Sequence, residues 1–123
     1  MPVRSLSSSV FKWPNAQEVA QAVRQWAHCA SQQRNEVQRI GYLGSYARGD
    51  WGVGSDLDLV IVVDFCDEPF ERRASSWDTT ALPVPADVLI YTNQEWQRLC
   101  QQRRFYETLM RETIWVYVKP NLI

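Results

Sequence analysis

Two aspartates separated by a single residue, Asp56 and Asp58, stand at the head of an apolar run that continues to Asp64. Residues at positions i and i+2 of a strand share one face, so we expect both carboxylates to point the same way. Two like charges side by side are unfavourable unless a cation lies between them, and carboxylate oxygens are hard ligands that suit Mg²⁺. The pair is therefore a candidate metal site, although a solvated strand end would show the same pattern.

A third aspartate lies inside another apolar segment. Asp87 is surrounded by Ala86, Val88, Leu89 and Ile90, and a charged side chain is rarely buried in such surroundings without a partner. If the strand that contains Asp87 lies beside the strand that follows the Asp-x-Asp pair, the three carboxylates form a trio. The other interpretation is an edge-strand aspartate that faces water.

A Gly-Ser pair ends a third apolar segment. Gly44 lets the backbone approach a ligand closely, and Ser45 at the start of a short helix offers a hydroxyl and free N–H groups to phosphate oxygens. Arg48 could offset negative charge on phosphate, and Ser55 could cap a turn or touch phosphate. A Gly-Ser pair alone is common in turns, so this motif gains its meaning from the aspartates that follow it.

Together these residues predict a phosphoryl-transfer site. We expect a triphosphate on the turn formed by Gly44 and Ser45. Two Mg²⁺ ions are expected on Asp56, Asp58 and Asp87. This arrangement follows the two-metal logic of in-line displacement, in which one ion holds the leaving pyrophosphate and the other activates an attacking hydroxyl. Asp87, on the nucleophile side, is the candidate to help deprotonate that hydroxyl.

Two capping-box patterns mark the helices that flank these motifs. Asn15 and Glu18 form the first pattern, and apolar residues then recur at helical spacing. Thr92 and Glu95 form the second pattern. The helix that it opens is expected to carry along one side Trp96, Leu99, Cys100, Arg103 and Tyr106.

Four segments have the composition of strands, and a short helix separates two of them. That helix is expected over 67–77, with Arg72 and Arg73 exposed to solvent. The continuous apolar run after Asp56 is typical of a buried central strand. The expected strands cover residues 37–43, 56–64, 86–91 and 114–118.

This order of elements predicts a small α/β (α+β) fold, in which a mixed sheet of three to four strands is flanked by helices. The chain contains no internal repeat and no linker that would divide it. We therefore expect one domain over 1–123, with a loose leader over 1–13 and a catalytic core over 41–91.

Composition excludes several classes of protein. The 123 residues are 46% hydrophobic and 22% charged, which is ordinary for a globular domain and excludes a disordered or collagen-like chain. Thirteen basic and fourteen acidic residues give a formal net charge of −1. This balance argues against a strongly basic nucleic-acid binder, so we expect no direct binding of nucleic acid.

The cysteines and the N-terminal residues bear on the compartment. Cys29, Cys66 and Cys100 are odd in number, widely spaced and free of Cys-x-x-Cys pairs, which argues against a zinc site or a disulfide framework. The N-terminal residues lack the apolar region of a signal peptide, and no run approaches the ~20 apolar residues of a membrane span. We expect a cytoplasmic protein that does not enter a membrane.

The motifs taken together resemble the polymerase-beta-type nucleotidyltransferase superfamily, and within it the minimal nucleotidyltransferase branch. The signature of that family is Gly-Ser, ten residues and then Asp-x-Asp, and residues 46–55 supply the ten-residue interval. The resemblance covers about 41–91, and none of the three motifs departs from an active pattern. It implies binding of Mg²⁺ and of a nucleoside triphosphate, ATP in the first instance, and nucleotidyl transfer to an acceptor.

The same resemblance implies a protein partner. Many minimal nucleotidyltransferases resemble antitoxins that are encoded beside a HEPN-domain protein, a helical RNase toxin. Some of them are proposed to silence that toxin by adenylylating one of its tyrosines. The resemblance thus implies that this chain acts as an antitoxin toward a HEPN-domain partner.

Three alternatives stay open at this level. The chain could neutralise its partner by complex formation alone, and its six tryptophans could form the interface, although core packing is the simpler role for them. It could modify an antibiotic-like small molecule, but such relatives use extra helical segments or a dimer around the acceptor. An Asp-x-Asp pair also occurs in sugar-nucleotide transferases, for which 123 residues is short. The nucleotide base, the acceptor atom and the presence of a homo-oligomer are left undecided.

Overall fold

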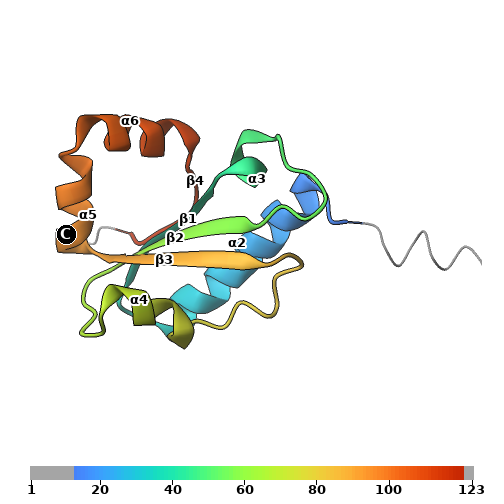
Figure 1. The fold of residues 1–123 in the computed structure, drawn as a ribbon. Helices are drawn as coiled ribbons and strands as arrows, with labels where there is room; N and C mark the ends of the chain where they lie inside the picture. Colours follow the sequence, from blue (N-terminus) through green and yellow to red (C-terminus); the bar gives the residue numbers. More distant parts are fainter. Residues whose placement is uncertain (1–12, 121–123) are drawn as a thin grey trace, which may run out of the picture.

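A four-stranded mixed sheet forms the centre of the computed structural model, which describes residues 13–120 (Figure 1). β1 (Val37–Leu43) is antiparallel to both β2 (Leu57–Val63) and β4 (Ile114–Val118), whereas β3 (Ala86–Thr92) is parallel to β2. The strand order is β3-β2-β1-β4, so β3 and β4 are the edges of the sheet. All four predicted strands are present.

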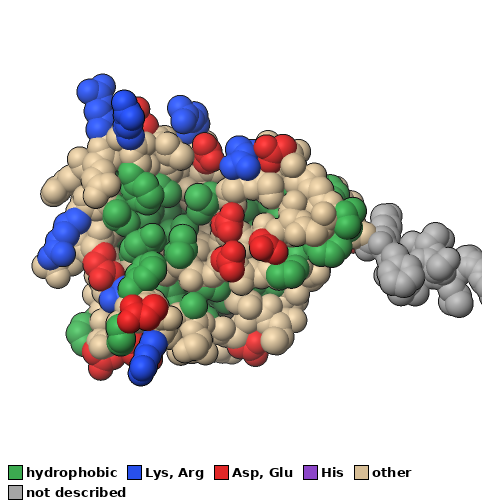
Figure 2. Space-filling model, viewed as in Figure 1, with side chains coloured by type: hydrophobic (Ala, Val, Ile, Leu, Met, Phe, Trp, Pro, Cys, Tyr) green, Lys and Arg blue, Asp and Glu red, His purple; other side chains and the backbone are tan. Residues whose placement is uncertain are grey.

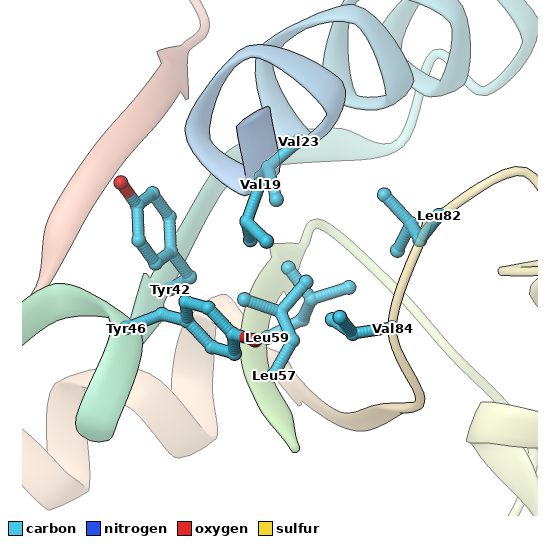
Figure 3. Packing of buried hydrophobic residues seen from close by; sticks show 8 residues of the cluster. All are labelled: Val19, Val23, Tyr42, Tyr46, Leu57, Leu59, Leu82 and Val84. Atoms are coloured by element: carbon cyan, nitrogen blue, oxygen red, sulfur yellow. The ribbon is translucent and has the colours of Figure 1, made fainter. Parts of the chain in front are cut away.

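The longest helix of the described residues, α2 (Ala16–Gln33), covers one face of the sheet (Figure 1). It begins with the predicted capping box, because the side chain of Asn15 accepts a hydrogen bond from the backbone N–H of Glu18. The Glu18 carboxylate in turn accepts one from the backbone N–H of Asn15. Figure 3 shows the apolar cluster between this helix, the sheet and the loop before β3: Val19, Val23, Tyr42, Tyr46, Leu57, Leu59, Leu82 and Val84.

Three expectations concern features outside the sheet. Within residues 13–120 no helix combines the length and the apolar character that crossing a membrane requires. The leader expected over 1–13 lies almost wholly outside the described residues. The three cysteines are all free thiols, one exposed and two partly buried.

Helices α5 (Asn93–Cys100) and α6 (Arg103–Glu112) cover only one end of the opposite face (Figure 1). Trp96 of α5 and Leu109 of α6 are both buried against the valines of β2. The indole of Trp115 on β4 meets that of Trp96 edge to face, with ring centroids 5.7 Å apart. This face of the sheet is therefore covered where β2 and β3 end and open where they begin.

The structure contains two helices where the sequence predicted one continuous helix through residue 106. α5 ends at Cys100, and Gln102 is extended (φ −83°, ψ 101°) before α6 begins. No glycine or proline marks this break. The reason is tertiary: Trp96 and Leu109 pack against the same part of β2, whereas 13 residues of straight helix would separate them by about 20 Å.

The prediction that Arg72 and Arg73 are both exposed is wrong for Arg73. The helix expected over 67–77 is a single turn, α4 (Phe70–Arg73), followed by a 3₁₀ turn, η1 (Ala74–Ser76). Arg72 is exposed as predicted, but the side chain of Arg73 is buried, with 7% of its surface accessible. Besides the nearby carbonyl of Glu68, its acceptors lie on β3 and α5, far along the chain, so the local pattern did not reveal its burial.

Arg73 ties three segments together through its guanidinium group. It donates to both carboxylate oxygens of Glu95, at 2.6 and 3.1 Å, and to the backbone carbonyls of Glu68 and Ile90. Glu95 also closes the predicted capping box by accepting a hydrogen bond from the backbone N–H of Thr92. These bonds, that from Arg73 first, lower the pKa of Glu95 from 4.5 to about 2.

The tryptophans serve packing, which confirms the simpler of their two predicted roles. All six lie in the described part of the chain, and none is among the large hydrophobic side chains that are strongly exposed. Trp77 and Trp96 are buried, Trp26 packs against Trp77, and Trp51 stacks on Tyr46.

The pair of Arg73 and Glu95 predicts a specific dependence of stability on pH. Because the folded-state pKa of Glu95 lies below its usual value, its stabilisation is fully present above pH 4.5 and is lost as the pH falls toward about 2. We expect Glu95→Gln to lower the free energy of unfolding by about 1–2 kcal/mol near neutral pH, since part of the carboxylate is solvated. Urea unfolding of both proteins at several pH values measures this difference, which should shrink in acid.

Glu107→Gln is the matched control. Glu107 accepts a hydrogen bond from Arg103 on the exposed side of α6, so its replacement should change the unfolding free energy little at any pH. An equal effect of the two substitutions would contradict the role of the buried pair.

Candidate active site

A glycine with a positive φ joins β1 to the short helix α3 (Ser45–Arg48). Gly44 has a φ of +86°, which side-chain-bearing residues rarely adopt. A Cβ atom added at Gly44 would also collide with Oδ2 of Asp58. The glycine predicted from the Gly-Ser motif is therefore favoured both by its backbone conformation and by the close approach of the Asp58 carboxylate.

The register of the sheet places two of the predicted carboxylates side by side. Leu43 at the end of β1 pairs with Asp58 on β2, and Asp58 pairs with Asp87 on β3. Residues paired in this way share a face, and the buried Leu57 and Leu59 show that the α2-covered face is the other one. Both aspartates therefore lie on the open part of the face that α5 and α6 partly cover.

Asp56 is the third member of this group, but it does not lie in the strand. The sequence predicted that the strand starts at Asp56, whereas β2 starts at Leu57 and Asp56 is exposed just before it. Its charge nonetheless acts on Asp58. Figure 2 shows acidic side chains gathered over the beginning of β2 and β3, beside an apolar area. We refer to Asp56, Asp58 and Asp87 as the carboxylate trio.

Electrostatic repulsion within the trio is visible at Asp58, the least exposed member. Partial burial is the main cause that raises the pKa of Asp58, and the negative charges of Asp87 and Asp56 raise it further. The guanidinium of Arg48 acts in the opposite direction. The site is therefore an acidic cluster whose ionised carboxylates a bound cation would stabilise.

The trio fits a hard divalent cation by its chemistry, since all its donors are carboxylate oxygens on one open face. As the side chains stand, however, no group of three or more His, Cys, Asp or Glu side chains within residues 13–120 is close enough to hold a metal ion. Binding would require the exposed carboxylates of Asp56 and Asp87 to rotate toward Asp58. The three predicted ligands therefore lie in one region of the surface, but their side chains are not arranged to bind a metal ion as they stand.

Two residues predicted to contact phosphate have protein partners in the structure. Arg48 forms ion pairs with Asp50 at 3.2 Å and with Glu112 at 3.4 Å. The hydroxyl of Ser55 accepts a hydrogen bond from the backbone N–H of Gly52 at 2.8 Å, so it caps the turn before β2. Contact of either residue with phosphate stays a prediction.

Other residues that support the site could not be found from the motifs. Glu112 lies 64 positions from Arg48 and links the end of α6 to α3. The indole N–H of Trp13 donates to the hydroxyl of Tyr46 at 2.7 Å, and the ring of Trp51 stacks on Tyr46 at 5.6 Å. These contacts hold α3 against the sheet. In the sequence, the position of Tyr46 directly after the Gly-Ser pair was the one signal for them.

Comparisons with known proteins agree with this geometry. The nucleotidyltransferase domain family matches this chain over residues 24–116. A solved structure of a candidate nucleotidyltransferase from Sulfolobus solfataricus is similar, with a TM-score of 0.59 and 15% identity over 89% of this chain and 92% of that one. A solved structure described as a toxin-antitoxin with AMP-PNP gives a TM-score of 0.42 and 17% identity over 86% of this chain and 75% of that one. Among curated proteins no sequence matches.

The predicted fold class is confirmed, because the mixed four-stranded sheet flanked by helices is that of a nucleotidyltransferase fold. The family match includes every residue of the carboxylate trio and the Gly-Ser pair. Since it also spans most of the sequence, this chain belongs to the family of nucleotidyltransferase domains.

Proposed function

We propose that this chain transfers a nucleoside monophosphate, AMP from ATP in the first instance, to a hydroxyl group of a partner protein. The observation that carries the proposal is the pairing of Asp58 with Asp87 across β2 and β3, directly against Gly44. Family membership supports nucleotidyl transfer in general. The nucleotide and the acceptor are part of the proposal.

The binding roles follow from position. Gly44 has no side chain to keep a phosphate group away from the backbone, and the Ser45 hydroxyl opens α3 beside it. Nucleotidyltransferase domains generally use divalent metals, and the carboxylate trio would hold two Mg²⁺ ions. Bound Mg²⁺ supplies neutralisation of phosphate charge and a lower pKa for an attacking hydroxyl. Arg48 would exchange an acidic partner for phosphate.

In the proposed reaction, the acceptor oxygen forms a bond to the α-phosphorus of the nucleotide. The bond from that phosphorus to the bridging oxygen breaks, and pyrophosphate leaves with the electron pair. Asp87, whose side chain is exposed at the site, accepts the proton of the acceptor hydroxyl. Asp58 and Asp56 would hold the Mg²⁺ that neutralises the negative charge of the phosphate groups.

The surroundings of the trio favour a macromolecular acceptor. Asp56 and Asp87 are exposed, on an open part of the sheet. Two hollows of the described surface lie away from the trio: one is lined by Arg34 and Trp77, the other by Phe70 and Tyr91. Because Asp56 and Asp87 are exposed, another protein could cover the trio and the nucleotide bound there, and so supply the acceptor hydroxyl. A tyrosine of a HEPN-domain toxin is the acceptor that the minimal nucleotidyltransferases suggest.

We further propose that residues 1–123 act as one nucleotidyltransferase domain in the cytoplasm, with the catalytic core in 41–91. In the antitoxin role, modification of the HEPN-domain partner would silence it. The alternative is neutralisation by complex formation alone. The tryptophans do not support it, because none of them is among the strongly exposed hydrophobic side chains that could form an interface. The variants described next distinguish the two.

Labelled ATP, Mg²⁺ and the protein encoded beside this chain, which we propose to be a HEPN-domain protein, provide the direct test of transfer. We expect the wild type to label the partner and Asp87→Asn to lower the rate by about 10²–10⁴-fold, because the proton acceptor is removed. Asp64→Asn is the matched control, since Asp64 flanks the other end of β2 and binds Asn93. Absence of label with the wild type, or equal labelling by Asp87→Asn, would refute catalysis. Neutralisation that persists in Asp58→Ala at an unchanged molar ratio would favour the binding module.

Replacement of Asp58 should separate stability from function. Burial first, and then the negative charges of Asp87 and Asp56, raise the pKa of Asp58, so its ionised form destabilises the fold increasingly as the pH rises through that pKa. Without divalent cations, we expect Asp58→Asn to raise the free energy of unfolding near neutral pH by on the order of 1 kcal/mol while activity is lost. Added Mg²⁺ and ATP should raise the thermal unfolding temperature of the wild type only. Stabilisation of both proteins by Mg²⁺ and ATP would contradict the role of Asp58.

Two glycine replacements isolate the close approach at the site. Gly44→Ala and Gly49→Ala both place a side chain on a backbone with positive φ, at +86° and +91°. A Cβ at Gly49 has no neighbour within 4 Å, whereas one at Gly44 collides with Asp58. We expect Gly49→Ala to cost about 1 kcal/mol and Gly44→Ala to cost about 1 kcal/mol more, because the Asp58 carboxylate must turn away, with loss of nucleotide binding. Chemical unfolding and ATP titration measure both effects, and equal costs would contradict the required contact.

A further inference from the structure

We propose that the acceptor protein docks by adding an extended segment to the free edge of β3, directly beside Asp87. This inference rests on the proposed function, and it specifies how a polypeptide acceptor is held. β3 pairs only with β2, so one side of its backbone faces away from the sheet. Within residues 13–120, no hydrogen bond engages the outward backbone groups of Ala86 and Val88.

Two hydrogen bonds establish which backbone groups of β3 point outward. The carbonyl of Pro85 accepts from the backbone N–H of Leu57, so it points toward β2. The carbonyl of Ile90 accepts from Arg73, which lies on the other side of β3. Because backbone groups alternate along a strand, Asp87 and Leu89 bond toward β2. The N–H and C=O groups of Ala86, Val88 and Ile90 therefore point away from the sheet.

Arg73 limits how far an added strand can extend. Its guanidinium occupies the outward carbonyl of Ile90 and is held there by Glu95. The rest of the edge, from Ala86 to Val88, is free of such a cap in the described structure. The open edge is therefore short and lies beside the carboxylate trio. Charged caps of this kind are a common way to prevent unwanted strand pairing.

The pleat of the sheet determines where the acceptor side chain goes. Residues directly opposite one another on neighbouring strands share a face. The residue of the added segment that lies opposite Asp87 therefore projects onto the face that carries Asp58 and Asp87. A hydroxyl-bearing side chain at this position continues the row formed by Leu43, Asp58 and Asp87.

The next residue on the same face of the added segment would meet an apolar surface. Leu89, two positions after Asp87, keeps 38% of its surface exposed, and Phe70 nearby keeps 42%. Figure 2 shows the apolar area that adjoins the acidic group on this face. The preferred acceptor is therefore an extended segment with a hydroxyl residue and, two positions away, an apolar one.

The other edge of the sheet is less suited to this role. β4 is separated from β2 by β1, so a strand added there would lie far from the trio. The pairing of β4 with β1 also shifts between Ile40 and Gly41, which indicates a β-bulge, and bulges discourage further pairing. A second copy of this chain on the β3 edge is the competing occupant, and the experiment below includes it.

The test replaces one outward backbone donor and compares two variants of the same residue. Val88→Pro removes the outward N–H without removing a bond to β2, and Val88→Ala loses comparable side-chain packing but keeps that N–H. With labelled ATP, Mg²⁺ and the HEPN-domain partner, we expect Val88→Pro to transfer label about tenfold or more slowly than Val88→Ala. Both variants should still be stabilised by Mg²⁺ and ATP in thermal unfolding, because the trio is intact.

Amide hydrogen exchange of the wild type provides a measurement that needs no variant. On addition of the partner and an ATP analogue whose α,β-bridging oxygen is replaced by a group that cannot be cleaved, the N–H groups of Ala86 and Val88 should become protected, and those of β4 should not. This measurement decides the question if Val88→Pro does not fold.

The outcomes are distinct. Absence of transfer by the wild type refutes the proposed function. Equal transfer by Val88→Pro and Val88→Ala, or unchanged exchange at Ala86 and Val88, overturns edge addition alone. Protection of these two amides that grows with protein concentration, without partner, overturns it in favour of a second copy of this chain.

Discussion

The parallel pairing of β2 with β3 in one particular register is the constraint on which the site depends. It places Asp58 opposite Asp87, and the antiparallel pairing with β1 brings Gly44 against the same aspartate. A shift of β3 by one residue would turn Asp87 toward the face that α2 covers, because side chains alternate along a strand. The register is held in turn by the apolar residues of β2 and β3 that pack on that covered face. Core packing on one side of the sheet thus determines the chemistry on the other side.

The site is unfavourable for the fold that carries it. Asp58 is partly buried beside two like charges, and both the burial, as the larger cause, and the repulsion raise its pKa. The buried residues of β2 and the capped helix α2 compensate on the other face of the sheet. Such a conflict between stability and function is common at catalytic and binding sites. Nucleotidyltransferase domains generally use divalent metals, and a cation at this site would relieve the repulsion.

The ion pair of Arg73 and Glu95 has a position that matters beyond stability. Glu95 caps α5, Arg73 bonds the edge of β3, and together they tie α4 to both elements. The edge that remains open is consequently the part that adjoins Asp87. A buried charged residue that the sequence assigned to the surface therefore shapes the accessible surface around the site.

The local patterns of this sequence were sufficient for its strands, its capping boxes and the glycine of the Gly-Ser pair, because these features depend on neighbours a few positions apart. The role of Asp56, Asp58 and Asp87 as one ligand set stays a prediction. The break between α5 and α6, the burial of Arg73 and the link between Arg48 and Glu112 depended on the tertiary structure. Their partners lie between 13 and 64 positions away, so their free energy exists only once the sheet has assembled. Likewise, the sequence could name Asp58 and Asp87, but the register of two strands decided that they lie side by side.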